Sequence, residues 1–334
     1  MKSVVLPAYN KNVLRAMLSL EIKESPMPVL EDEEVLIKTH ASVCNPSDIA
    51  FIQGVYNIVK PVPTTPGFEG AGEVVDTGKD AVSFLGKKVS AFVQNDNYGT
   101  WSEYFIAKTS DIIVLNDDMN MDEGACFTVN PFTAYGLFET VKYTHAKAII
   151  QNASGGQVAA FMRKMAEDFG CEVIDIVRKK ETAEMLISEG AKYVLVETDE
   201  DFDNQLTDIC NKLNPSVGFD AVGGSLSGKI YNALAPNSDL VVYGGLSNKP
   251  MSDLSVMDAI FNDKVISGFN LIDWKQQLGE GEFDEISQDL QQKFTDGTYK
   301  TKISDTIEMK NIIRGLKSYL SNMSAGKILI KPII

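Results

Sequence analysis

The residues best suited to chemistry form a short turn at positions 152–159, Asn-Ala-Ser-Gly-Gly-Gln-Val-Ala. This turn lies between an apolar run at 146–150 and a helix-like segment at 161–169. Small residues there let the backbone approach a pyrophosphate, and the first N–H groups of a helix offer donors and a positive dipole end. The pattern predicts a nucleotide-binding turn. Its Ala-x-x-Gly-x-x-Ala spacing is a loosened dinucleotide fingerprint, which an ordinary tight turn between a strand and a helix could also produce.

A basic cluster follows the next expected strand, at 171–177. An enzyme that binds NAD would carry an acidic residue there for the ribose hydroxyls. This chain instead has Val177 followed by Arg178, Lys179 and Lys180. A guanidinium can bind a 2′-phosphate in a bidentate fork, whereas an acid would repel it, so the cluster predicts NADPH rather than NADH. The alternative is a solvated basic first turn of the following helix.

The composition of the 334-residue chain excludes several classes of protein. A net charge of −15 argues against nucleic acids and anionic membranes as main partners. The four cysteines contain no C-x-x-C pair, which is typical of a reducing compartment without disulfides. No apolar run is long enough for a transmembrane helix, and the N-terminus has no clear signal pattern. We therefore expect a soluble, cytoplasmic protein, with an organellar form whose transit peptide was removed as the alternative.

The strand pattern changes along the chain, and this length suits two domains. Short strands separated by glycines indicate an antiparallel, β-rich first region, with strands expected at 35–42, 70–75, 86–93 and 99–106. Later strands alternate with helical segments, which predicts a doubly wound parallel sheet and an α/β fold class; these strands are expected near residues 147, 172, 192, 217, 239 and 264.

Two of the later strands end in glycine pairs, Gly223 with Gly224 and Gly244 with Gly245. The carboxyl ends of parallel strands are where such sheets bind ligands, so these pairs support a cofactor crevice, although each alone could be an ordinary loop. The chain should then form helices at 283–294 and 310–320 and a closing strand at 327–330 that returns to the first domain.

Six stretches resemble the medium-chain dehydrogenase/reductase superfamily, in its branch of quinone oxidoreductases and 2-enoyl thioester reductases. They are NPSDIAFIQGVY (45–56), PGFEGAGEVV (66–75), NPFTAY (130–135), QNASGG (151–156), VVYGGLS (241–247) and SGFNLIDW (267–274). The resemblance implies a GroES-like catalytic domain made of residues 1–122 and 273–334. It also implies a Rossmann NADPH-binding domain at 123–272 and a homodimer.

The resemblance also implies that zinc is absent. Zinc-dependent alcohol dehydrogenases of this superfamily place Cys and His ligands where this chain has Asn45 and Phe68, and neither can replace a thiolate or an imidazole. Without a Lewis acid, we expect hydride transfer to an acceptor that needs less activation, either an α,β-unsaturated carbonyl such as an enoyl thioester or enone, or a quinone. A low-turnover NADPH-binding protein is the alternative.

The resemblance assigns site residues by motif position. Tyr56 corresponds to the catalytic tyrosine that serves the enolate oxygen, with a packed structural tyrosine as the alternative. The cofactor-binding residues implied are Asn130 beside the nicotinamide; Gly155, Gly156, Gln157 and Val158 in the pyrophosphate turn; Arg178, Lys179 and Lys180 at the 2′-phosphate; Tyr243, Gly244, Gly245, Leu246, Phe269, Asn270 and Leu271 in two late turns; and Lys327 near the nicotinamide end.

Two positions depart from the family pattern. Asn270 stands where the family has Trp in Gly-Phe-Trp-Leu, and Ala159 replaces the usual third glycine. The sequence does not identify the physiological acceptor, because the substrate pocket of this family is lined by loops without a readable code.

Overall fold

The computed structural model describes residues 1–94 and 98–333 and divides into two compact units. The first unit is Met1–Asn130 with Gly281–Ile334, and the second is Pro131–Glu280. The predicted combination of a β-rich domain and a doubly wound sheet is confirmed. The exact domain limits stay a prediction. No helix in the described ranges is both long and apolar enough to span a bilayer.

The first unit is built on a mainly antiparallel sheet with the strand order β14-β15-β3-β4-β5-β7, and β6 also pairs with β3. Its strands are β3 (Glu34–Val43), β4 (Glu69–Thr77), β5 (Lys88–Phe92), β6 (Tyr104–Lys108), β7 (Ile112–Val114), β14 (Ile303–Glu308) and β15 (Lys327–Lys331). Strands β1 (Lys2–Val5) and β2 (Glu21–Glu24) form a separate antiparallel pair. The predicted strand at 99–106 is too long, because the N–H groups of Thr100 and Trp101 bond to Gly67 and Pro66 before β6 begins.

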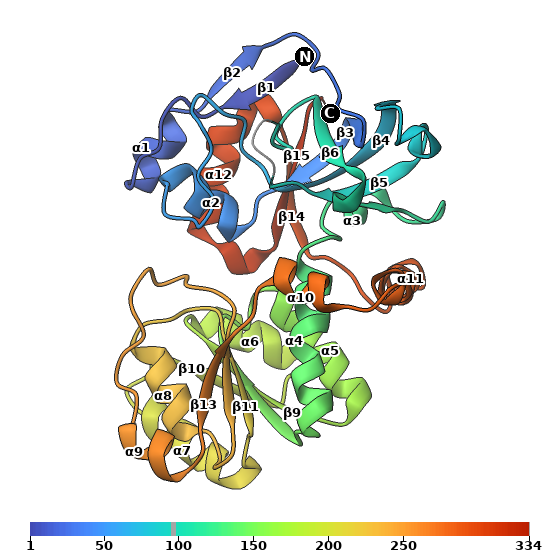
Figure 1. Ribbon diagram of the computed structural model, residues 1–334. Coiled ribbons are helices and arrows are strands. Elements are labelled where there is room, and N and C mark those ends of the chain that lie inside the picture. The colour runs from blue at the N-terminus through green and yellow to red at the C-terminus, as the bar shows by residue number, and fades with distance from the viewer. Residues whose placement is uncertain (95–97, 334) are drawn as a thin grey trace. The chain divides into compact units, whose positions relative to one another are not determined.

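The C-terminal strand β15 joins the sheet beside β3 (Figure 1). The two strands run antiparallel, with Leu329 opposite Val43 and Ile330 opposite Ser42. In an antiparallel ladder, the residue one position earlier on one strand lies opposite the residue one position later on the other strand. This register brings Lys327, at the start of β15, to Asn45, which follows β3, although the two residues are far apart in the sequence.

Three helices of the first unit pack on one core, and the sequence reading missed two of them. These are α1 (Val13–Leu18), α2 (Pro46–Gln53) and α12 (Ile312–Ser321), of which only α12 was expected. Pro46 occupies the first turn of α2 and Gly54 ends it with a φ of 69°, a left-handed conformation that favours glycine. The other helices of this unit are α3 (Met121–Gly124), α11 (Glu282–Thr295), and the 3₁₀ turns Val82–Phe84, Thr109–Asp111, Met309–Asn311 and Met323–Ala325.

The second unit is a doubly wound sheet whose described strands all run parallel in the order β10-β9-β8-β11-β12-β13. Helices lie on both faces of this sheet (Figure 1). The strands are β8 (Ala148–Gln151), β9 (Glu172–Val177), β10 (Tyr193–Val196), β11 (Val217–Asp220), β12 (Asp239–Val242) and β13 (Val265–Gly268). The helices are α4 (Asn130–Thr144), α5 (Gln157–Phe169), α6 (Lys180–Ser188), α7 (Phe202–Leu213), α8 (Ser225–Ala233), α9 (Val256–Phe261) and α10 (Leu271–Gln277).

Candidate functional site

A buried chain of polar side chains runs through the first unit. The ammonium of Lys327 donates a hydrogen bond to Oδ1 of Asn45, and Nδ2 of Asn45 donates to Oε2 of Glu69 over 2.7 Å. All three side chains are buried. The other carboxylate oxygen of Glu69 accepts the Val129 N–H at 2.8 Å and the Thr128 hydroxyl at 3.3 Å. An amide thus links a cation to a carboxylate, and both Glu69 oxygens have partners.

Asp48 adds a second buried carboxylate to this region. Its oxygens accept the backbone N–H groups of Asn45, at 2.7 Å, and of Phe68, at 3.0 Å. Burial raises the pKa of Asp48 to about 7, and the charge of Glu69 raises it as well, while the two N–H donors and Lys327 lower it. Burial also raises the pKa of Glu69, and Lys327 again lowers it. One cation therefore stabilises the ionised form of two buried acids.

Tyr56 follows α2 and lies against the same core. Its ring packs on the ring of Phe68, with centroids 5.5 Å apart and planes tilted by 37°. Burial raises the pKa of the phenol, and the negative charge of Asp48 raises it further, whereas a hydrogen bond with the Gln94 side chain lowers it. Tyr56 is therefore a protonated, half-buried hydrogen-bond donor at neutral pH.

The donor set of this region does not suit zinc. Asn45 is engaged by Lys327 and Glu69, and Phe68 presents an aromatic ring. Nowhere in residues 1–94 and 98–333 do three or more His, Cys, Asp or Glu side chains gather as they would around a metal ion. Cys44 is buried, and burial raises its thiol pKa well above the ordinary value, so it is a poor source of thiolate.

The glycine-containing turn of the second unit connects β8 to α5. Ala153 has a φ of 50°, and the Gly156 N–H bonds to the Ala153 carbonyl at 2.8 Å. Ser154 fixes the turn to β9, because its hydroxyl donates to Gln151 and accepts the Ile176 N–H. Gly156 is the N-cap of α5 and provides no capping side chain. The turn is rigid, small and followed directly by a helix N-terminus, as a pyrophosphate site requires.

The same turn is supported from its other side by Asp220 at the end of β11. Nδ2 of Asn152 donates to Asp220 at 2.6 Å, and Oδ1 of Asn152 accepts the Ala221 N–H. The Ser227 hydroxyl and the Gly223 N–H also donate to Asp220. This buried network ties the first glycine turn to Gly223 and Gly224, so the carboxyl ends of β8 and β11 are held together.

The basic cluster lies at the carboxyl end of β9. Arg178 is exposed, Lys179 is the N-cap residue of α6, and Lys180 forms a 3.1 Å ion pair with Asp199. Among the described residues, Arg178 has no ion pair of its own. Arg178 and Lys179 are therefore more available to a phosphate than Lys180, which is already partly neutralised. Burial raises the pKa of the Glu197 carboxyl group, however, and Arg178 lies close enough to Glu197 for its charge to lower that pKa.

The two late turns follow β12 and β13 at the same edge of the sheet. After β12, Tyr243 is half-buried and Gly244, Gly245 and Leu246 are exposed. A Cβ on Gly244 would lie 2.8 Å from the carbonyl oxygen of Ala221, so a larger residue could not be placed there without movement.

After β13, Phe269 and Leu271 are half-buried. Asn270 has a local structural role, because its Oδ1 accepts the N–H groups of Ile272 and Asp273 and caps α10. This cap gives a physical reason for the departure from the Trp of the family pattern. The role of Asn270 in cofactor binding stays a prediction.

Asn130 supplies an independent observation that fits a cofactor. Its side chain is 7% exposed, and its Nδ2 is a buried donor without a hydrogen-bond partner among the described residues. Buried amide donors are normally satisfied, so this one suits an acceptor atom of a bound group. The role of Asn130 beside the nicotinamide stays a prediction, while within the second unit the glycine turn and Arg178 offer groups that suit a phosphorylated dinucleotide.

The sequence analysis did not assign two buried acids of this region, Glu69 and Asp48, to the site. The sequence does contain a signal for Asp48. Asn-Pro-Ser-Asp is typical of the start of a helix, where the carboxylate of the fourth residue accepts a hydrogen bond from the backbone N–H of the first. The partnership of Glu69 with Lys327 through Asn45 depends on the pairing of β3 with β15, and no local pattern encodes it.

Comparisons with known proteins match both units. The family model for the alcohol dehydrogenase GroES-like domain matches residues 31–117, and the model for zinc-binding dehydrogenases matches residues 158–288. The mitochondrial enoyl-[acyl-carrier-protein] reductase of Rattus norvegicus is 30% identical over 272 residues, 80% of this chain and 72% of that protein. The enzyme of the same name from Arabidopsis thaliana is 30% identical over 261 residues, 75% of this chain and 67% of that protein.

Solved structures show the same fold over the whole chain. A protein from Mesorhizobium loti classified among the NADPH:quinone reductases has a TM-score of 0.92 and 31% identity, covering 99% of this chain and 98% of that one. The mitochondrial 2-enoyl thioester reductase Etr1p/Etr2p heterodimer from Candida tropicalis has a TM-score of 0.80 and 22% identity, covering 99% of both chains. At that lower identity the likeness concerns the fold alone.

Proposed function

Because the chain belongs to the medium-chain dehydrogenase/reductase superfamily and is an oxidoreductase of its zinc-free branch, we propose that it reduces the conjugated double bond of enoyl thioesters or enones. The cofactor is NADPH. Three features support this cofactor. The first is the glycine turn before α5, and the second is that Arg178 forms no ion pair among the described residues. The third is the buried Nδ2 donor of Asn130, which has no hydrogen-bond partner among those residues. When bound, NADPH supplies the hydride.

The half-buried phenol of Tyr56 is the observation that carries the proposal. When hydride adds to the β-carbon of an enoyl thioester, the double-bond electrons move toward the carbonyl and give an enolate. A donor held at that oxygen stabilises the developing charge, and a proton must then reach the α-carbon. Because the pKa of Tyr56 is raised, its hydroxyl keeps its proton at neutral pH and can donate to that oxygen.

Lys327 contributes positive charge without a metal. Its ammonium is held by Asn45, and Asn45 is held in turn by Glu69, so the position of this cation is fixed by two buried partners. A fixed positive charge in a low-dielectric site favours nearby negative charge more strongly than it would in water. We propose that Lys327 lies near the nicotinamide end of the cofactor and that no catalytic zinc is bound.

Reduction of quinones is the second candidate, and the relationship to the Mesorhizobium loti protein favours it. A reduced quinone is a weaker base than a thioester enolate, and water can protonate it. Quinone reduction should therefore depend less on Tyr56 than enoyl reduction does, which separates the two activities experimentally.

We also propose a homodimer formed through the edge of the second unit's sheet. Strand β13 pairs only with β12 among the described strands, so its other edge is unpaired. The adjacent helix α9 exposes Val256, Met257, Ile260 and Phe261, the last with 73% of its surface accessible. Unpaired strand edges and contiguous apolar surface are typical of association sites.

The experiment that tests the proposed function is NADPH oxidation by wild-type protein and Tyr56→Phe with enoyl-CoA thioesters, enones and quinones. A positioned donor contributes about 10²–10⁴-fold, so Tyr56→Phe should lower kcat for enoyl thioesters within that range. The dissociation constant for NADPH and quinone turnover should change little. Enoyl reduction that survives the loss of the hydroxyl would make Tyr56 structural, and activity with quinones alone would favour the second candidate.

A further inference from the structure

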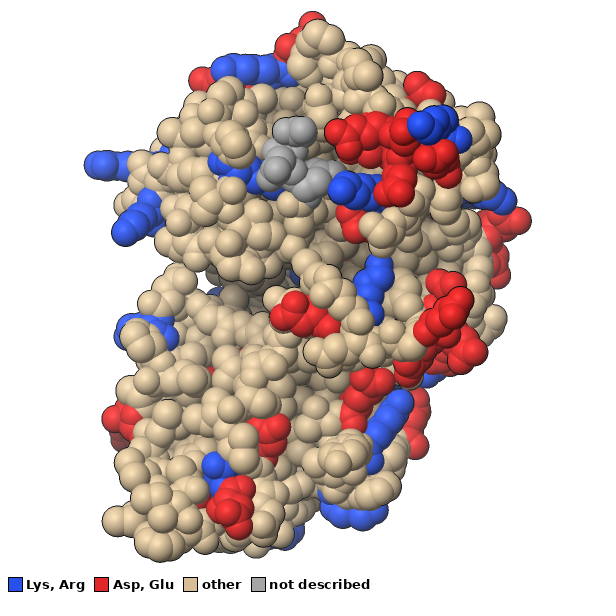
Figure 2. Space-filling view, in the orientation of Figure 1, with Lys and Arg blue, Asp and Glu red and all other residues tan. Residues whose placement is uncertain are grey.

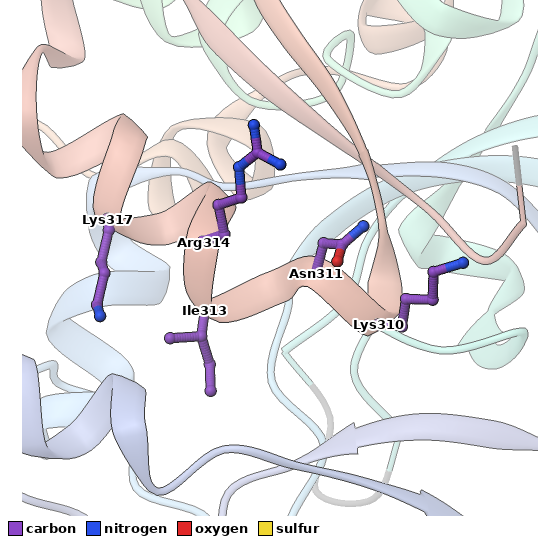
Figure 3. A pocket seen from close by; sticks show the side chains of 5 residues that line it. All are labelled: Lys310, Asn311, Ile313, Arg314 and Lys317. Carbon is purple, nitrogen blue, oxygen red and sulfur yellow. The ribbon is translucent and has the colours of Figure 1, made fainter.

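One arginine of the second unit is directed into the fold. Of the four arginines in the chain, three are exposed. Arg314 is one of these, and it lines a surface hollow where the Lys310, Arg314 and Lys317 side chains point in different directions (Figure 3). Figure 2 likewise shows Lys and Arg side chains at the surface. Arg163 of α5 differs, because only 19% of its side chain is exposed and its charge faces a buried acid.

Arg163 reaches two acceptors with one terminal nitrogen. Its Nη1 donates to the Ser154 carbonyl at 2.8 Å and to Oδ1 of Asp175 at 2.9 Å. This nitrogen of a guanidinium carries two hydrogens, so both bonds form at once. Asp175 lies in β9 and is buried, and its Oδ1 also accepts Nε2 of Gln151 at 2.7 Å. Its Oδ2 has no hydrogen-bond partner among the described residues, so Arg163 balances a carboxylate that is bonded through one oxygen.

The Ser154 carbonyl belongs to the glycine-containing turn between β8 and α5. This carbonyl and the Gly155 N–H are parts of one planar, trans peptide group and point in opposite directions. A donor that holds the carbonyl therefore also fixes the direction of the N–H. Within the part of the chain that the structure describes, no group accepts the Gly155 N–H, which leaves this donor available to an anion.

The turn needs support because its backbone is strained. Ala153 has a φ of 50°, a left-handed conformation that is costly for residues other than glycine. The Ser154 hydroxyl ties the turn to Gln151 and Ile176, but these bonds do not involve the peptide group between Ser154 and Gly155. Arg163 holds that peptide group from the side of α5.

We propose that Arg163 and Asp175 are positioning residues that direct the Gly155 N–H toward the pyrophosphate of the cofactor. This inference rests on the proposed assignment of the glycine turn to NADPH. Because Asp175 balances the charge of Arg163, the pair acts by orienting the turn rather than by attracting the cofactor. The pyrophosphate is common to NADPH and NADH, so the pair serves both cofactors equally, in contrast to Arg178.

The test uses Arg163→Met combined with Asp175→Asn, which removes the donor to Ser154 without leaving an unbalanced buried carboxylate. Fluorescence titration should show the dissociation constants of NADPH and NADH both rising about 10-fold, the loss expected for one charge-assisted hydrogen bond. In NADPH oxidation assays, KM for NADPH should rise while kcat is kept, because the pyrophosphate is bound alike in the ground state and the transition state. The melting temperature should stay close to that of the wild type.

Two single variants complete the test. Lys164→Met removes the neighbouring cation of α5, which is paired with Glu167, and should leave both dissociation constants unchanged. Arg163→Lys keeps a positive charge beside Asp175, but its ammonium lacks the planar fork of the guanidinium. This variant should therefore keep its stability and recover binding only in part.

Other results would overturn the proposal, each for a different reason. A loss with NADPH alone would assign Arg163 to the 2′-phosphate. Full recovery of binding in Arg163→Lys, or a loss of affinity that accompanies a large fall in melting temperature, would make the pair purely structural. Wild-type affinity in the double variant would show that the turn does not need this donor. Wild-type protein that binds neither NADPH nor NADH would remove the cofactor assignment itself.

Discussion

Replacing Lys327 with methionine should destabilise the first unit strongly and in a pH-dependent way. Methionine keeps most of the apolar stem but removes the cation that faces Asn45, Glu69 and Asp48. Removing one partner from a buried charged group typically costs about 3–5 kcal/mol, because the remaining charge is left uncompensated. For a unit of this size, that loss corresponds to a decrease on the order of 10 °C in melting temperature.

The pH dependence follows from the direction of the pKa shifts. Burial already raises the folded-state pKa of Asp48 to about 7, and that of Glu69 above its usual value, while Lys327 lowers both. Without Lys327, both folded-state pKa values rise further. A carboxyl whose pKa is raised on folding contributes stability at low pH that is lost as pH rises through the folded-state value. The difference in melting temperature between wild type and Lys327→Met should therefore be larger at pH 8 than at pH 5.5.

Calorimetry or urea denaturation at both pH values measures this effect. Lys88→Met, which removes an exposed lysine from β5, is the control and should change stability little. Adding Glu69→Gln to Lys327→Met should recover part of the loss, because it removes one uncompensated charge. A loss below about 1 kcal/mol that is equal at both pH values would refute the argument that Lys327 stabilises buried carboxylates.

Two further predictions concern the second unit. Arg178→Ala should weaken NADPH binding by about 1.5–3 kcal/mol and NADH binding far less, as measured by fluorescence titration, because only NADPH has the phosphate that a charged hydrogen bond would serve. Lys180→Ala is the matched control and should have a smaller effect, since Lys180 is paired with Asp199; equal losses for both cofactors would argue against the assignment of Arg178. If the protein forms the proposed homodimer, Phe261→Asp should convert it to a monomer in sedimentation velocity, and an unchanged dimer would place the interface elsewhere.

The parallel sheet could be predicted from the sequence because its central strands, such as β8 and β11, are buried on both faces. Such strands read as short apolar runs, as in Ala148–Gln151 and Glu172–Val177, and glycines mark their ends. The family resemblance drawn from the motifs is likewise confirmed by the comparisons. Strong local patterns were sufficient for these parts of the fold.

The first unit was predicted less completely, because its helices are short. Helix α1 has only six residues, too few for a periodic apolar pattern. Helix α2 had recognisable signals, with Asn45 and Pro46 at its start and Gly54 at its end, but its eight residues lie within an apolar stretch that lacks a clear period. The pairing of β15 with β3 joins segments from opposite ends of the chain, and no local pattern specifies that register.

The hydrogen-bonded side chains of Lys327, Asn45 and Glu69 also explain how the buried carboxylate of Glu69 is stabilised without metal-ligating side chains beside it. A buried carboxylate is costly unless its charge is balanced and its oxygens are hydrogen-bonded. Here Val129, Thr128 and Asn45 satisfy the oxygens, and Lys327 provides the opposite charge. A divalent cation placed among these groups would face the ammonium of Lys327 at close range. Asn45→Cys combined with Phe68→His should therefore not create a zinc site while Lys327 remains, because the lysine already supplies the positive charge that this carboxylate requires.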